Sequence, residues 1–168
     1  MGACGRADSP ARAARSGSDE PPLRAAGDPV RVDRRSPVTA PWRAVADTSV
    51  LIGLEGGRVA VEDFAEYSWA VSTVTLGELR LGVIQAVDPL VASHRLATYQ
   101  LAQQFDPLVI DEDVADSWAV LVARLRAEGR KMPINDSWIA ATALAHDVPL
   151  VTQDADYDHA PGLTVIKL

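Results

Sequence analysis

Short apolar segments alternate with helical segments from residue 43 to the end of the chain, and this alternation is the strongest constraint on the fold. Two parallel strands need a long crossover connection, usually a helix, so the alternation predicts parallel strands joined by right-handed crossovers. The short segments are mostly apolar, as is typical of strands that are buried on both faces. We therefore expect an α/β protein, a three-layer α/β/α sandwich around a short parallel sheet of four to five strands.

The expected elements begin and end at changes in apolar periodicity and at Gly and Pro. Strands are expected at 43–47, 68–72, 107–110, 149–152 and 164–166. Helices are expected at 48–55, 59–67, 91–105, 111–128 and 136–146, and a further helix of about 15 residues begins at residue 73. Thr48 and Ser49 have N-capping chemistry for the first helix, and Asn135 has it for the last.

Two of these helices have an apolar face at helical spacing. In the helix that begins at residue 73, the face consists of Leu76, Leu79, Val83, Ile84 and Val87. In the helix over 111–128, it consists of Val114, Trp118, Leu121, Val122 and Leu125. We expect the four tryptophans to serve the core rather than to stack on nucleic-acid bases.

Residues 1–41 are rich in Ala, Arg, Pro, Gly, Ser and Asp and lack a periodic apolar pattern. Such a segment buries too little apolar surface to offset the entropy of ordering. We expect a disordered tail, or sequence upstream of the true start codon, followed by a folded domain over 42–168. The segment has no apolar core of a secretory signal, and its five acids argue against an Arg-rich transit peptide, which is the sharper alternative.

Charge is unevenly distributed along the chain. Residues 1–40 carry seven Arg and five acids, a net +2, and because the whole chain carries −7, the remainder carries −9. A domain of that charge does not attract nucleic acid by its overall charge. The single cysteine, Cys4, excludes an intramolecular disulfide and is consistent with a reducing compartment, so we expect a cytoplasmic protein. No apolar run approaches the roughly 18 residues of a membrane span, and no membrane association is expected.

Acidic residues follow the expected strands or begin the helices after them. Asp47 ends the first strand, Glu78 lies one turn into the helix after the second, Asp136 begins the last helix, and Asp154 follows the fourth strand. In a parallel sheet these junctions lie at one edge, where ligands of open α/β sheets bind. The topology therefore predicts that four acids distant in sequence converge.

Four carboxylates in one small cleft would repel one another and raise each other's pKa. A hard divalent cation with oxygen ligands, Mg²⁺ or else Mn²⁺, relieves this repulsion, and the sequence has no Cys/His constellation typical of zinc. A hydrated cation in a carboxylate cup suits phosphodiester hydrolysis, with two cations about 4 Å apart as a second arrangement.

Each acid also has an ordinary structural explanation. Asp47 is a suitable helix cap, and Asp136 is a favourable charge at a helix N-terminus. The ordinary explanation of Glu78 is an exposed helix position, although its apolar surroundings make that position less ordinary, and the ordinary explanation of Asp154 is a turn. Only their joint placement at one edge distinguishes a metal site from four unrelated acids.

Four segments in order resemble the PIN domain, and in particular the VapC-type toxins of bacterial type II toxin–antitoxin pairs. These segments are 46–52 (ADTSVLI), 73–83 (TVTLGELRLGV), 134–144 (INDSWIAATAL) and 150–157 (LVTQDADY). The resemblance spans about 43–168. The extension over 1–41 departs from the family, whose members usually begin a few residues before the first Asp.

The resemblance implies a metal-dependent endoribonuclease held inactive by a cognate antitoxin, and a homodimer. Asp47, Glu78, Asp136 and Asp154 match the family's catalytic, metal-binding acids. The resemblance also assigns supporting roles to Thr48, Ser49, Thr152 and Asp156. The antitoxins of the family commonly place an Arg in the acidic pocket, and a pocket of acids on a −9 domain independently favours a basic peptide.

RNA must reach this acidic site, and three cations are candidates for contact with its phosphates: Arg80, Arg130 and Lys131. The last two belong to a loop that leads directly to Asp136. Ordinary alternatives are a solvated helix face for Arg80 and a solvated loop for Arg130 and Lys131.

Other functions of α/β proteins fit less well. A haloacid-dehalogenase-like phosphatase needs a second Asp two residues after the first, where this chain has Ser49. A response-regulator receiver needs an acid cluster before its phosphorylated Asp and a late Lys after a strand, and neither is evident. A PIN-like module that only binds a partner would not need all four acids.

Deletion of residues 1–40 is expected to leave the melting temperature and RNA cleavage unchanged, because the folded domain begins after them. Differential scanning calorimetry and a cleavage assay on the full and shortened chains measure both properties. A large loss of melting temperature would show instead that the segment is structural.

Overall fold

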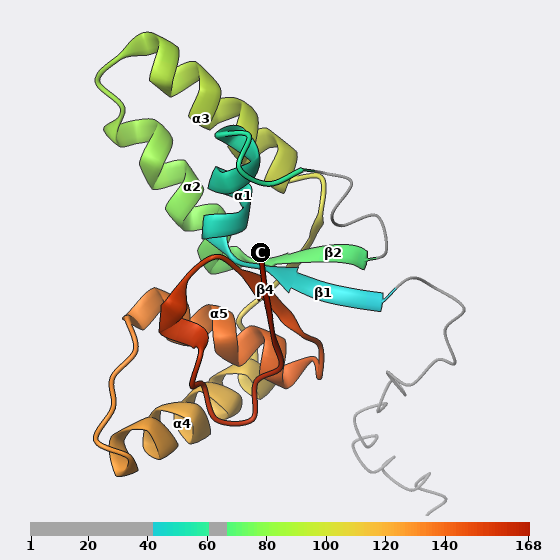
Figure 1. Ribbon diagram of the computed structural model, residues 1–168, viewed down its shortest axis with the longest axis vertical. Helices are drawn as coiled ribbons and strands as arrows, with labels where there is room; N and C mark the ends of the chain where they lie inside the picture. Colours follow the sequence, from blue (N-terminus) through green and yellow to red (C-terminus); the bar gives the residue numbers. More distant parts are fainter. Residues whose placement is uncertain (1–41, 61–66) are drawn as a thin grey trace, which may run out of the picture. The chain divides into compact units, whose positions relative to one another are not determined.

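The computed structural model describes residues 42–60 and 67–168, which belong to a compact unit over Val38–Leu168 (Figure 1). Its strands are β1 (Trp42–Ala46), β2 (Tyr67–Ser72), β3 (Asp106–Leu108), β4 (Leu150–Thr152) and β5 (Val165–Lys167). Its helices are α1 (Thr48–Glu55), α2 (Thr73–Gln85), α3 (Pro89–Ala102), α4 (Glu112–Ala127), α5 (Ile134–Ala145) and the short 3₁₀ helix η2 (Ala155–Tyr157). The predicted alternation of strands and helices is confirmed.

The five strands form one parallel sheet in the order β3-β2-β1-β4-β5. The chain winds outward from β1 in one direction through β2 and β3, and then crosses back to β4 and β5 on the other side. The order therefore reverses between β1 and β4. Open α/β sheets bind ligands outside the carboxyl ends of the strands at such a reversal.

Helices cover both faces of the sheet, with α4 and α5 on one side and α1, α2 and α3 on the other (Figure 1). Successive residues of β1 alternate between these layers, as the pleat requires. Val45 packs against α4 and α5 through Leu121, Ile139 and Ala143. On the opposite face, Ala46 packs with residues of α1, α2 and α3. The predicted three-layer sandwich and the predicted apolar face of α4 are confirmed.

Two predicted helix caps are wrong. Asp47, rather than Thr48 or Ser49, is the N-cap of α1, and its side chain accepts a hydrogen bond from the Ser49 backbone. The N-cap of α5 is Pro133, which has no side-chain cap, and Asn135 lies one residue inside the helix. In both cases, a polar side chain that was predicted to cap its own helix instead contributes to the site.

The apolar face predicted for α2 is wrong in its second half. Leu79 is buried, but Ile84 is 67% exposed, and Val87 lies beyond the helix and is 98% exposed. The ends of α2 and α3 that meet at residues 86–88 form a hairpin that extends away from the sheet (Figure 1). The helical period continues there, but no sheet lies beneath it to bury those side chains.

The helix predicted over 59–67 falls mainly on 61–66, which lie outside the described residues. At its ends, Val59 and Ala60 are not helical, and Tyr67 belongs to β2. Among the described residues, none of the helices has the length and apolar character needed to cross a membrane.

Leu121→Ala is expected to lower the free energy of unfolding by about 2–5 kcal/mol, because it leaves a cavity between α4 and the sheet. Leu121 is 1% exposed, whereas Val120 beside it is 52% exposed. Val120→Ala is therefore the matched control, with an expected change within about 0.5 kcal/mol. Urea unfolding of the two variants measures both values, and equal losses would contradict the packing described for α4.

Candidate metal centre and active site

The carboxyl edge of the sheet, at the reversal between β1 and β4, carries the predicted acids. Asp47 directly follows β1, and Asp154 follows β4 by two residues. Asp136 lies in the first turn of α5, and Glu78 lies in α2. The parallel topology thus brings these segments to one place, as the strand-end positions predicted.

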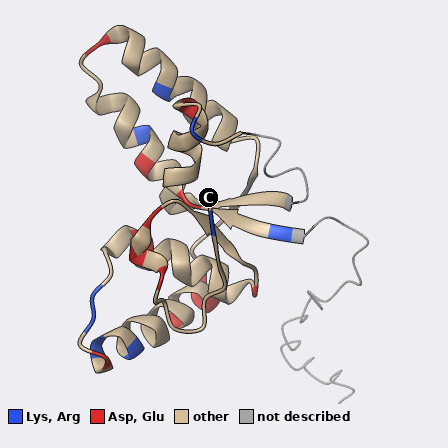
Figure 2. Cartoon of the chain, in the orientation of Figure 1, with Lys and Arg blue, Asp and Glu red and all other residues tan. Residues whose placement is uncertain are grey.

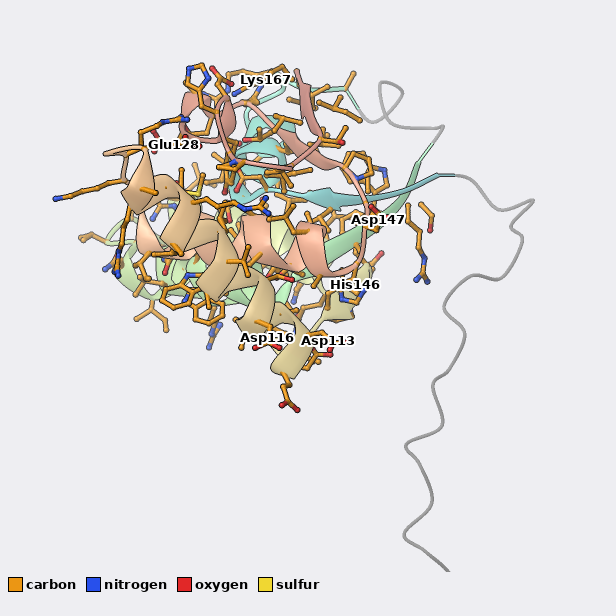
Figure 3. The ribbon with its side chains drawn as sticks, turned by 90° about the horizontal axis from the view of Figure 1, so that it is seen from below. Asp113, Asp116, Glu128, His146, Asp147 and Lys167 are labelled. Atoms are coloured by element: carbon orange, nitrogen blue, oxygen red, sulfur yellow. The ribbon has the colours of Figure 1, made fainter. Side chains whose placement is uncertain are left out.

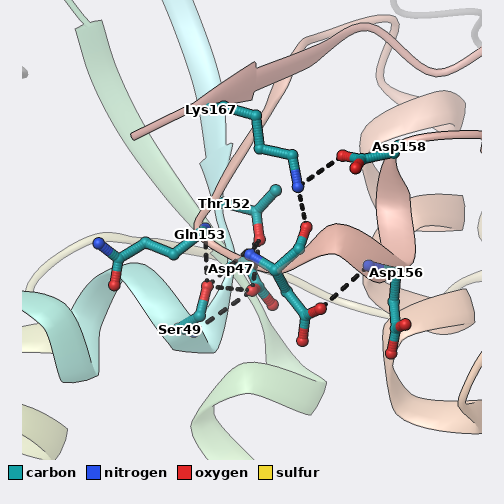
Figure 4. A network of polar contacts seen from close by, with 8 residues as sticks. Asp47, Ser49, Thr152, Gln153, Asp156, Asp158 and Lys167 are labelled. Atoms are coloured by element: carbon teal, nitrogen blue, oxygen red, sulfur yellow. Dashed lines mark hydrogen bonds and ion pairs between the residues drawn. The ribbon is translucent and has the colours of Figure 1, made fainter.

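Asp47 is the most heavily bonded acid of the site and is only 4% exposed. Its Oδ2 accepts hydrogen bonds from Ser49 Oγ at 2.6 Å and Thr152 Oγ1 at 2.9 Å, besides that from the Ser49 backbone N–H (Figure 4). Its Oδ1 accepts from Tyr157 Oη at 3.0 Å. These donors compensate the burial of the carboxylate, which would otherwise be strongly unfavourable.

Ser49 and Thr152 also connect the two loops of the site. Ser49 Oγ accepts a hydrogen bond from the Gln153 backbone at 3.0 Å, and Thr152 Oγ1 accepts from the Asp154 backbone at 2.9 Å. The two hydroxyl oxygens lie 3.2 Å apart. The β1–α1 and β4–η2 junctions are therefore held together by side chains from both.

Glu78 has two donors of its own. Its Oε2 accepts from Thr48 Oγ1 at 2.5 Å, and its Oε1 accepts from Asn135 Nδ2 at 2.8 Å. Three elements, α1, α2 and α5, therefore meet at this carboxylate. Asn135, predicted as a helix cap, instead positions Glu78 and lies next to Asp136 in the chain.

The tightest group of acids among the described residues consists of Asp136, Asp154 and Asp156. Each offers one carboxylate oxygen, and these oxygens lie within 4.8 Å of one another. Asp154 caps η2 and accepts a hydrogen bond from the Asp156 backbone at 3.0 Å, which fixes their spacing. The group fits a hard divalent cation, because all three donors are carboxylate oxygens.

Electrostatic repulsion in this group is visible at Asp136. Burial, followed by the charges of Asp47, Asp154, Glu78 and Asp156, raises its pKa from the ordinary 3.8 to about 7. Asp47 and Glu78 are outside the tight group but still act on it through their charge. The charges of the other predicted acids thus act together on Asp136 and raise its pKa.

Tyr157 and Lys167 belong to the site although the sequence reasoning missed them. Tyr157 is fully buried, and burial together with the charge of Asp47 raises the pKa of its phenol well above the usual range. Lys167 Nζ donates to the Asp154 carbonyl and lies 2.7 Å from Asp158 Oδ1 (Figure 4). Lys167 ends a parallel strand, so the reasoning applied to the acids would also have found it. No comparable signal marks Tyr157.

The three predicted phosphate contacts have different surroundings. The Arg80 guanidinium lies 5.7 Å from the centre of the Tyr99 ring on α3, and the structure does not bring it into the acidic group. Arg130 donates to the His159 carbonyl at 2.8 Å and to Glu128 at 3.3 Å, so it holds the loop before α5 against the segment after η2. Lys131 is exposed in that loop.

Asp136→Asn is expected to stabilise the metal-free protein near neutral pH. Because the pKa of Asp136 is raised in the folded protein, the unfolded chain releases this proton at a lower pH than the folded protein does. The stability that the protonated Asp136 carboxyl contributes is therefore fully present below about pH 4 and is lost as the pH rises through about 7. Above pH 7, we expect the variant to exceed the parent by about 1–2 kcal/mol after allowance for solvent screening.

Thermal unfolding in excess chelator measures this difference across the pH range. The melting temperatures of parent and variant are expected to separate progressively between about pH 4 and 7 and then to stay apart. A constant difference at every pH would contradict the repulsion described for Asp136.

Comparison with known proteins agrees with this fold. The model of the family described as "PIN domain" matches residues 44–163. Ribonuclease VapC4 of Mycobacterium tuberculosis is 59% identical over 126 residues, which cover 75% of this chain and 97% of that protein. Ribonuclease VapC5 of the same organism is 38% identical over 130 residues, covering 77% and 96%.

A solved structure agrees as well. The crystal structure of VapBC-5 from Mycobacterium tuberculosis, a member of the VapBC family of toxin-antitoxin systems, matches with a TM-score of 0.65. The identity is 36%, and the match covers 76% of this chain and 98% of that chain. From the family model and these relatives together, we conclude that the chain belongs to the PIN-domain family and, within it, to the VapC proteins.

Proposed function

We propose that this protein is a Mg²⁺- or Mn²⁺-dependent endoribonuclease toxin that hydrolyses RNA phosphodiester bonds. The observation that carries the proposal is the group of Asp136, Asp154 and Asp156 at the carboxyl edge of the sheet, with Asp47 and Glu78 beside it. The relatives named ribonuclease VapC support the choice of RNA as substrate.

In this proposal, Asp136, Asp154 and Asp156 hold the cation, and Asp47 and Glu78 complete its negative surroundings. A divalent cation held there would supply polarisation of the scissile phosphate, activation of a water molecule and compensation of charge on the leaving oxygen. Ser49, Thr152 and Tyr157 keep Asp47 in one orientation, and Thr48 and Asn135 do the same for Glu78.

We further propose that the protein acts in the cytoplasm and is neutralised by a cognate antitoxin that places a basic side chain among these acids. The VapBC complexes support a partner of this kind. A cationic side chain satisfies the same carboxylates as a metal ion does and blocks phosphate from approaching them. A gene immediately upstream that encodes a short DNA-binding protein with a basic tail would agree with this role.

A homodimer is the assembly that we propose. The hairpin of α2 and α3 exposes apolar side chains that one chain leaves uncovered, among them Ile84, Val87 and Leu90. Exposed apolar groups that lie together are typical of surfaces that pair with another protein. Sedimentation of the purified chain distinguishes a dimer from a monomer.

Asp136→Asn is expected to reduce RNA cleavage at least about 100-fold while leaving the fold intact, because it removes a metal ligand without changing side-chain volume. Asp116→Asn is the matched control: Asp116 is an exposed acid of α4, far from Lys167 at the site (Figure 3). Cleavage of labelled RNA is measured for both variants and for the parent, with Mg²⁺ or Mn²⁺ and with excess chelator.

Cleavage that persists in chelator would overturn the metal mechanism. Full activity of Asp136→Asn would overturn the assignment of the site. A parent chain that binds RNA and the cation but never cleaves would favour a PIN-like binding module without catalysis.

A further inference from the structure

A cavity of about 400 Å³ lies between α4, α5 and the loop that joins them. Its apolar lining includes Trp118, Val122, Leu125 and Met132. The volume falls within the roughly 300–1,000 Å³ of ligand-binding pockets. None of these four residues was needed for the metal site described above.

One wall of the cavity is a rigid aromatic ring. The Trp118 indole stacks on Trp138 with ring centres 4.6 Å apart and planes inclined by 7°. Trp118 Nε1 donates to Ser137 Oγ at 2.9 Å, and Ser137 Oγ in turn donates to the Ile134 carbonyl at 2.6 Å. Trp138 covers one side of this ring, and Trp118 still lines the cavity, so Trp118 packs on the apolar face of α4 as the sequence predicted and is also half-exposed to the cavity.

The rim of the cavity is basic, although the domain is strongly acidic. Arg126, Arg130 and Lys131 all line it. Figure 2 shows Lys and Arg gathered at the end of α4 and in the loop that leads to α5. Arg130 is engaged by Glu128 and the His159 carbonyl, but no acid within the described residues forms an ion pair with Arg126 or Lys131. Two cations are therefore available to a ligand from outside.

The cavity adjoins the candidate active site through the first turn of α5. Ile134 and Ser137 line the cavity, and Asp136 lies between them in the chain. Consecutive Cα atoms are only about 3.8 Å apart, so the backbone that lines the cavity also carries Asp136. The helix turn that carries Asp136 is thus shared by the two sites.

We propose that this cavity binds one unpaired base of the RNA substrate, next to the phosphodiester bond that is cut, and that it contributes to sequence preference. The inference rests on the proposed ribonuclease function. An aromatic wall with an apolar floor accepts the face of a base, and Arg126 and Lys131 meet the flanking phosphates. An acidic peptide would use the cations but not the flat aromatic wall, so RNA suits the whole lining better.

Filling the cavity tests the base subsite. Val122→Trp places an indole in the cavity, and Val120→Trp makes the same change at a position of α4 that lies outside it and is 52% exposed. Binding of short fluorescein-labelled single-stranded RNA of random sequence is measured by anisotropy, in full-length chains that also carry Asp136→Asn to prevent cleavage. We expect Val122→Trp to weaken binding about tenfold and Val120→Trp to leave it unchanged.

The rim cations provide a second test that does not disturb packing. Arg126→Ala and Lys131→Ala are each expected to lower the slope of log affinity against log salt by about 0.7, as for one lost phosphate contact on a single strand. Arg124→Ala is the matched control, because Arg124 lies on the same helix but lines another cavity, beside Gly162. Arg126→Lys keeps the positive charge and is expected to keep the parent's slope of log affinity against log salt.

Sequence preference gives the sharpest readout. Chains with Asp136 intact cleave a random RNA library, and the cut ends are sequenced. We expect Val122→Trp to relax the preference for one base beside the cut, whereas Lys131→Ala slows cleavage at all sequences alike. Both effects require that the variants keep the parent's circular dichroism spectrum and melting temperature to within a few degrees.

The outcomes separate this inference from the function on which it rests. Normal cleavage and unchanged preference in Val122→Trp and Arg126→Ala overturn the base subsite and leave the ribonuclease proposal standing. A change of oligomeric state in Val122→Trp with unchanged RNA binding also overturns it and assigns the cavity to a protein partner. Failure of the parent to bind or cleave any RNA overturns both proposals together.

Discussion

The structure of the site depends on one buried carboxylate, that of Asp47. A buried acid is tolerated only where donors surround it, and here Ser49, Thr152 and Tyr157 supply them from three segments of the chain. The same bonds hold the β1–α1 junction against the β4–η2 junction. Asp47 is therefore both the cap of α1 and a side-chain link between two strands, β1 and β4, that the backbone also pairs. Loss of the Tyr157 hydroxyl would leave the buried Oδ1 without its donor, at about 1–3 kcal/mol.

Around this point, the protein keeps acids together at a cost to its own stability. Asp47 has enough donors to remain buried, but no residue in the described part of the chain donates a hydrogen bond to the Asp136 carboxylate, and burial and the neighbouring acids raise its pKa to about 7. Groups that repel one another in the free protein are relieved by whatever positive charge enters between them. The site is thus selective for cations before any substrate is considered.

Much of this arrangement could be predicted because, in a parallel sheet, the order of strands and helices in the sequence shows which residues lie at the carboxyl edge. Any acid directly after a strand must lie at the carboxyl edge, so Asp47 and Asp154 were placed without knowledge of side-chain packing. Hydrogen-bond partners were not predictable in this way. Asn135 and Tyr157 act on acids that are distant in sequence, and nothing in their neighbours indicates it. The apolar period of α2 failed at Ile84 because periodicity does not show where the sheet beneath a helix ends.

In the proposed function, an acidic protein must bind RNA, which is also negatively charged, and the distribution of charge indicates how. The acids lie at the carboxyl edge, while Arg126 and Lys131 line the cavity to which the first turn of α5 also contributes. A strand of RNA can therefore be held by its phosphates and a base on the basic side, while only one phosphate reaches the acids. In the proposal, the three acids would hold a cation that reverses the sign of the local charge there, whereas a basic side chain from a protein partner would occupy the same place without activating water. The proposed catalysis and the proposed inhibition thus depend on which positive charge the same acidic group holds.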